Sequence, residues 1–85
     1  MAEVIVTLKI MPESVEIDLD ELEKKIKEKI KPEKIEREPI AFGLVALKLV
    51  KIVPDASGEM DKLEKELKEI DGVKEVEVIG ITRSL

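Results

Sequence analysis

The stretch Glu38-Pro39-Ile40-Ala41-Phe42-Gly43-Leu44, at the middle of an 85-residue chain, joins two segments that have the residue pattern of β-strands. Pro39 cannot donate a hydrogen bond to a neighbouring strand, so it suits an edge strand or the end of a strand. Gly43 permits the positive φ or the close backbone approach that a hairpin tip requires. The stretch therefore predicts a β-hairpin that turns at Phe42 and Gly43.

Phe42 is the only aromatic residue in the chain, while the apolar residues of the segment that follows are all aliphatic. One interpretation is that the ring fills a gap in the hydrophobic core beside the turn. The other is that it is an exposed anchor for a protein partner, because large rings are enriched among the residues that dominate binding energy. The sequence leaves both interpretations open.

The two arms of the hairpin differ in polarity. Residues Lys34 to Ile40 alternate but are mostly polar, which predicts an edge strand. Residues Leu44 to Val53 are rich in β-branched side chains and predict a long, largely buried strand. Strict alternation would place Lys48 and Lys51 on opposite faces. Either one lysine therefore extends along apolar surface to water, or a bulge shifts the phase between them.

The segments outside the hairpin supply one further strand and one helix on each side. Before the hairpin, the apolar and polar residues from Ala2 to Met11 alternate, which predicts a strand. Its core-facing residues are expected to be Val4, Val6, Leu8 and Ile10. A helix is then expected from about Leu19 to about Ile30, after a capping box at Asp18 to Glu21. After the hairpin, Met60, Leu63, Leu67 and Ile70 predict a helix that stops at Asp71-Gly72. A final strand from Val73 to Ile81 has a phase slip at Gly80, and a tail from Thr82 to Leu85 follows.

The order strand, helix, strand, strand, helix, strand predicts an α+β fold of the ferredoxin-like βαββαβ type. In this plait a four-stranded antiparallel sheet has the order 4-1-3-2, with two helices on one face. At 85 residues, we expect one domain spanning residues 1–85. The topology places Phe42 at one end of the sheet and Arg83 at the other, about 20 to 30 Å away.

Composition excludes several classes of function. Charged residues make up 41% of the chain, with both signs interspersed, which is typical of the ion-paired surfaces of proteins that work at high temperature. A net charge of −5 and a single aromatic residue disfavour direct nucleic-acid binding. The chain contains no cysteine or histidine, so thiol chemistry, soft metal ligands and the commonest general base are excluded.

No pattern in the chain indicates an enzyme or a bound cofactor. There is no glycine-rich phosphate loop, no serine nucleophile beside a base and no apolar run of the roughly 18 residues that a membrane helix needs. We therefore expect no membrane association and a cytoplasmic location.

An acidic cluster precedes and enters the first expected helix. It consists of Glu13, Glu16, Asp18, Asp20 and Glu21. These carboxylates could bind a hard cation, but helix capping and the helix dipole explain them better.

Arg83, two residues from the C-terminus, is the last charged side chain. It can belong to a frayed, solubilising tail, or it can enter an anionic or metal-binding pocket of a partner, because a guanidinium is always charged.

Three segments together carry a family resemblance. Residues Glu38 to Leu47, the strand end Lys9-Ile10-Met11-Pro12-Glu13-Ser14 and the helix start Asp18-Leu19 are similar to archaeal translation elongation factor 1-beta. The resemblance covers essentially the whole chain, and Glu38 to Leu44 is its specific part. It implies a small ferredoxin-like domain that acts as a guanine-nucleotide exchange factor for the GTPase elongation factor 1-alpha, without bond-making chemistry.

The resemblance also implies which residues meet this partner. Phe42, with Ala41 and Gly43 beside it, is expected to dock on the second domain of the GTPase. The C-terminal residues Arg83, Ser84 and Leu85 are expected to approach its nucleotide site, where a basic side chain disturbs the magnesium and phosphate contacts. The similar eukaryotic domain has a penultimate lysine where Ser84 stands here. Either Arg83 takes that role from a shifted register, or the archaeal-type factor disrupts the site through its backbone or another side chain; of the two, we assign the role to Arg83. We expect the free chain to be a monomer.

An alternative from another class is a ferredoxin-like regulatory or small-ligand-binding module. Such a module would self-associate through its exposed sheet face, with Ile5, Thr7 and Lys9 contributing. A dimer that leaves GDP release unchanged would favour this alternative.

Overall fold

In the computed structural model of the chain, the secondary-structure elements follow the predicted order. They are β1 (Glu3–Pro12), α1 (Leu19–Lys29), β2 (Lys34–Pro39), β3 (Val45–Pro54), α2 (Glu59–Lys68) and β4 (Val73–Arg83). The structure describes residues 3–55 and 58–83. The element boundaries lie within a few residues of those expected from periodicity and turn residues.

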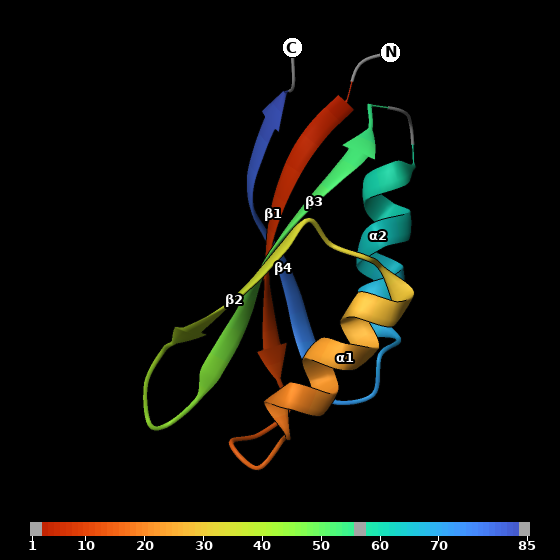
Figure 1. Cartoon of the computed structure of the whole chain (residues 1–85). Helices are drawn as coiled ribbons and strands as arrows, with labels where there is room; N and C mark the ends of the chain where they lie inside the picture. Colours follow the sequence, from red (N-terminus) through yellow and green to blue (C-terminus); the bar gives the residue numbers. More distant parts are fainter. Residues whose placement is uncertain (1–2, 56–57, 84–85) are drawn as a thin grey trace.

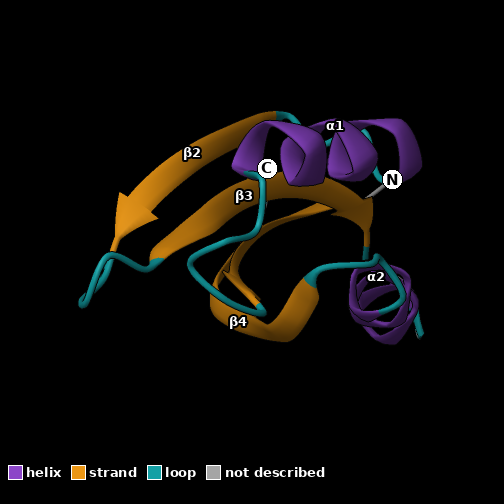
Figure 2. Ribbon diagram, turned by 90° about the horizontal axis from the view of Figure 1, so that it is seen from below, coloured by secondary structure: helices purple, strands orange, loops and turns teal. Residues whose placement is uncertain are grey.

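The four strands form one antiparallel sheet in the order β2-β3-β1-β4, which is the predicted order read from the other edge. Figure 1 shows the start of β1 and the end of β4 at one end of this sheet and the β2–β3 loop toward the other. Figure 2 shows both helices on one face, which leaves the opposite face open. The chain is therefore an elongated two-layer α+β plait, 41 Å along its longest axis.

The hydrophobic core lies between the helices and the alternate residues of β1 and β3. Val4, Val6, Leu8 and Ile10 are all buried, as the alternation of β1 predicts, and their neighbours on the strand are more exposed. The helices contribute Leu22 and Ile26 from α1 and Leu63 and Leu67 from α2. Burial of each such side chain contributes about 1.5–3 kcal/mol, so this aliphatic core stabilises the fold without disulfides.

Strand β3 carries Lys51 without a bulge. Its register with β1 runs unbroken from Val53, opposite Val4, to Leu47, opposite Ile10. Lys51 therefore stands on the core-facing side, where its ammonium group donates to the Lys31 carbonyl oxygen at 3.1 Å and lies 3.9 Å from a Glu33 carboxylate oxygen. Of the two alternatives for the lysine pair, the one in which a lysine extends along apolar surface is confirmed.

Strand β4 is longer than the sequence predicted. The register shifts between Thr7 and Leu8, where Gly80 and Val78 are the β4 partners, so Ile79 is an extra residue beside the expected slip at Gly80. The strand then continues through Arg83, which pairs with Val4. The prediction that a tail begins at Thr82 is wrong, because pairing with β1 extends the ladder.

One residue of the acidic cluster, Asp18, caps the N-terminus of α1. The Asp18 side chain accepts hydrogen bonds from the backbone N–H groups of Asp20 and Glu21, at 3.0 and 3.3 Å, which confirms the capping interpretation at this residue. Charged side chains form six ion pairs within residues 3–55 and 58–83. Neither α1 nor α2 has the length and apolar character needed to span a bilayer.

Candidate functional site

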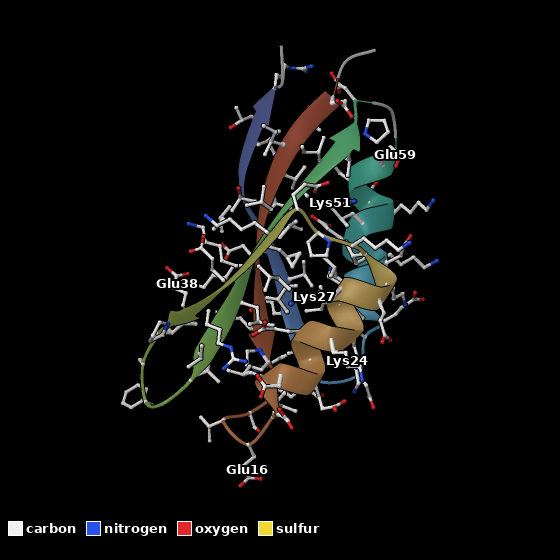
Figure 3. All side chains as sticks on the ribbon, viewed as in Figure 1. Glu16, Lys24, Lys27, Glu38, Lys51 and Glu59 are labelled. Atoms are coloured by element: carbon white, nitrogen blue, oxygen red, sulfur yellow. The ribbon has the colours of Figure 1, made fainter. Side chains whose placement is uncertain are left out.

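The residues expected to meet a partner lie at opposite ends of the sheet. Strands β1 and β2 run in one direction and β3 and β4 in the other, so the β2–β3 loop and the end of β4 point apart. Figure 3 places Glu59, at the start of α2, toward the upper end of the view and Glu16, in the loop after β1, at the lower end. Strand β3 alone spans ten residues, which corresponds to about 30 Å between the two ends.

The ring of Phe42 is fully exposed, at 101% of its reference area. The interpretation that Phe42 fills a gap in the core is therefore wrong, because the hairpin tip extends past the last residues of the core. Figures 1 and 2 show this loop projecting away from both helices. Ala41 and Gly43, its neighbours, are exposed as well. Ala41, Phe42 and Gly43, which were expected to dock on a partner, therefore lie together on one protruding tip.

Phe42 also has an unfavourable backbone conformation. Its φ is +54° and that of Gly43 is +79°, and the Leu44 N–H donates to the Ala41 carbonyl oxygen at 2.9 Å. Positive φ at both central residues is the requirement of a type I′ turn, which favours Asn or Gly at the first position. A phenylalanine in this left-handed region costs about 1–2 kcal/mol. Neither the core nor the turn gives a reason for an aromatic ring at this position.

Two further apolar side chains are exposed near the tip. Val15, in the loop after β1, is 62% exposed, and Ile40 is 41% exposed. Val15 lies against the hairpin, because a Cβ placed on Gly43 would be 4.0 Å from its Cγ1. A hollow of about 290 Å³ lies beside this contact, with Phe42, Val15 and Met11 in its wall. Val15 was not among the predicted contact residues, although an apolar residue between Ser14 and Glu16 was a signal for it.

Ion pairs hold the hairpin against the rest of the fold. Arg37 of β2 donates from Nε to Glu23 of α1 at 2.6 Å, and from Nη2 to Asp20. These two hydrogen bonds, the one to Glu23 above all, raise the pKa of the Arg37 guanidinium. On the open face of β2, the Lys34 ammonium lies 2.7 Å from the Glu36 carboxylate, which raises the pKa of Lys34 and lowers that of Glu36. Arg37 thereby ties the base of the hairpin to α1 while its tip projects, whereas the Lys34–Glu36 pair lies within β2.

At the opposite end, Arg83 is an ordered strand residue. It pairs in register with Val4 of β1, and its Nη1 donates to the carboxylate of Asp55, in the loop after β3. Its side chain is nevertheless 74% exposed, against 33% for that of Asp55. The frayed-tail interpretation is therefore wrong for Arg83. Ser84 and Leu85, which were expected to accompany it, lie outside the described residues.

The two ends of the sheet differ in their chemistry. In the part of the chain that the structure describes, no cluster of three acidic side chains could hold a metal ion. The chain has no cysteine or histidine. What it offers is an apolar anchor at one end and a cation at the other. Such an arrangement suits a protein that contacts a partner at two separate points.

Comparison with known proteins identifies the family. Residues 5–83 match the family model described as EF-1 guanine nucleotide exchange domain. Among similar proteins, the elongation factor 1-beta of Methanothermobacter thermautotrophicus is 47% identical over 98% of both chains. That of Methanoregula boonei is 48% identical, over 96% of this chain and 98% of its own, and that of Hyperthermus butylicus is 46% identical, over 98% and 96%. The chain therefore belongs to the family of EF-1 guanine nucleotide exchange domains, which are exchange factors of translation elongation rather than enzymes.

Proposed function

We propose that this exchange factor acts on elongation factor 1-alpha through the two ends of its sheet, with a different task at each end. Phe42 docks in an apolar pocket on the GTPase and supplies affinity. Arg83 reaches the nucleotide site and weakens the contacts that hold GDP. Free GTP then refills the emptied site.

The observation that carries this proposal is the state of Phe42. A single ring, fully exposed and held at φ +54°, gains nothing from its own chain. Backbone strain of this kind persists where function needs it. A buried aromatic anchor contributes about 2 kcal/mol or more to a protein interface, which exceeds the cost of the strained turn. Docking of the ring on a partner therefore gives the residue a reason to be there.

Arg83 suits the second task because of its charge and its exposure. A guanidinium forms charge-assisted hydrogen bonds with phosphate and carboxylate oxygens, the groups that hold Mg²⁺ and nucleotide in a GTPase. Its side chain remains largely exposed at the end of β4. An added cation in such a site competes with Mg²⁺ for the same oxygens. The nucleotide would then dissociate faster.

Exchange of this kind needs no bond-making chemistry. The exchange factor binds the nucleotide-free GTPase more tightly than the GDP-bound form, and GDP and the exchange factor therefore weaken each other's binding by the same factor. Binding energy from the Phe42 end can be used to oppose GDP at the Arg83 end. We further propose that the free chain is a cytoplasmic monomer and that residues 1–85 act as one domain.

The test is the release of a fluorescent GDP from elongation factor 1-alpha. The wild-type chain at substoichiometric concentration should accelerate release, because each molecule dissociates after GTP binds and acts again. Phe42→Ala and Arg83→Ala should each blunt this acceleration. Ile79→Ala is the control for Phe42→Ala, since Ile79 is an exposed apolar residue on β4, away from both ends. Unchanged release, together with a dimer in solution, would instead support a self-associating module.

A further inference from the structure

The contact between Asp55 and Arg83 joins two segments that are 28 residues apart in the chain. Arg83 shares a face of the sheet with Val4, its register partner, and with Val53, the partner of Val4 on β3. Strand β1 lies between β4 and β3, so the arginine side chain must extend across β1 to reach the loop after β3. The contact therefore fixes the direction of a long, otherwise free side chain.

Asp55 is well placed to hold this direction. It follows Pro54, whose ring fixes φ, at the point where β3 ends opposite Glu3 of β1. Its side chain is only 33% exposed, whereas the arginine that it contacts is 74% exposed. The carboxylate is thus the more fixed partner of the pair.

The contact leaves most of the guanidinium available. Among the described residues, Asp55 engages Nη1, and neither Nε nor Nη2 of Arg83 has a carboxylate partner. A guanidinium has five N–H donors in a rigid plane, so it can keep one acceptor and donate to another. The pair need not break when Arg83 meets an anionic group, which argues against Asp55 as a mere competitor for it.

We propose that Asp55 is a positioning residue for Arg83, holding the guanidinium across β1 so that its free donors already point toward the partner before binding. This inference rests on the proposed role of Arg83 in GDP release. A side chain that is ordered beforehand loses less freedom when it docks, which corresponds to about a two- to tenfold gain for one long side chain.

The experiment measures GDP release from elongation factor 1-alpha at saturating exchange factor. Asp55→Ala should lower the maximal release rate about two- to tenfold, with the half-saturating concentration unchanged. Asp55→Glu should restore most of the rate, because it returns the carboxylate. In an Arg83→Ala background, Asp55→Ala should cause no further loss. Asp61→Ala, at an exposed acidic residue of α2, makes the same change in charge and should have no effect.

A second readout reports on Arg83 directly and does not depend on exchange. In the free chain, the Nε–H resonance of Arg83 should shift in Asp55→Ala and show faster side-chain motion, while Asp55→Glu stays close to wild type. A purely structural role for Asp55 would lower the thermal stability and slow release equally with and without Arg83.

The outcomes separate this inference from the proposed function. If Arg83→Ala slows release but Asp55→Ala does not, or accelerates it, only the positioning role is overturned. If the Nε–H resonance of Arg83 is unaffected by Asp55→Ala, the positioning role is also overturned. If Arg83→Ala exchanges GDP normally, the role of Arg83 in the proposed function fails and the positioning role fails with it.

Discussion

The two ends of the sheet present opposite chemistry in opposite ways. At the hairpin end an apolar ring stands free on a strained turn, with its side chain fully exposed. At the other end a charged side chain lies on a regular strand, held by an ion pair. A ring can bury area in a pocket but cannot compete for phosphate, and an exposed guanidinium contributes specificity more than buried area. From this difference we propose that affinity and nucleotide release are separate tasks of separate ends.

The largest expected effect is on affinity. Phe42→Ala should weaken binding to nucleotide-free elongation factor 1-alpha about 30-fold, because truncation of a buried aromatic anchor costs about 2 kcal/mol or more. Isothermal titration calorimetry measures this change. Ile79→Ala, at an exposed apolar residue away from both ends, is the control and should bind normally. Wild-type affinity of Phe42→Ala would break the assignment of the hairpin end.

The next effect is on release rather than affinity. Arg83→Ala should lower the maximal rate of GDP release about tenfold, since a hydrogen bond to a charged group contributes about 1.5–3 kcal/mol. The half-saturating concentration should change little. Stopped-flow fluorescence over a range of exchange-factor concentrations separates the two quantities. Arg83→Lys keeps the charge and tests whether the planar guanidinium is required.

A smaller effect concerns stability at the hairpin end. Phe42→Asn creates Asn-Gly, the pair that a type I′ turn favours, and should raise the free energy of unfolding by about 1 kcal/mol. Phe42→Ala keeps a Cβ at positive φ and should leave stability nearly unchanged. Urea denaturation compares the two variants, both of which should bind poorly. A destabilised Phe42→Asn would mean that the ring packs against its own chain.

The smallest effect is electrostatic and lies on the open face of β2. Lys34 lowers the pKa of Glu36, so the pair stabilises the fold fully above the ordinary carboxyl value of 4.5 and less as the pH falls through the lowered pKa. In Lys34→Met, an NMR titration should show the pKa of Glu36 moving up toward 4.5. GDP release by this variant should equal that of wild type, because the pair belongs to neither contact.

Much of the fold could be predicted from local patterns. The alternation of β1 gave its buried face, and the residues Pro39 and Gly43 gave the hairpin, because strand period and turn chemistry are local properties. The lysine pair of β3 shows the limit. Alternation allowed either a bulge or an extended Lys51, and the choice depended on the Lys31 carbonyl and on Glu33, which come from a distant loop.

The candidate site was predictable only in part. Topology placed Phe42 and Arg83 at opposite ends, but whether the ring was buried depended on how far the tip extends beyond the core. The length of β4 and the partner of Arg83 were missed for a related reason. Both depend on pairing with β1 and on Asp55, which is 28 residues away and lies at the same end only once the plait is formed.

If the two ends perform separate tasks, as we propose, a double-variant cycle should separate their effects. GDP release is measured against concentration for wild type, Phe42→Ala, Arg83→Ala and the double variant. Phe42→Ala should raise the half-saturating concentration, Arg83→Ala should lower the plateau, and the double variant should show both changes in full, because sites this far apart act independently. If both single variants change the same quantity, or the double variant is no worse than either one, the separation of tasks is contradicted.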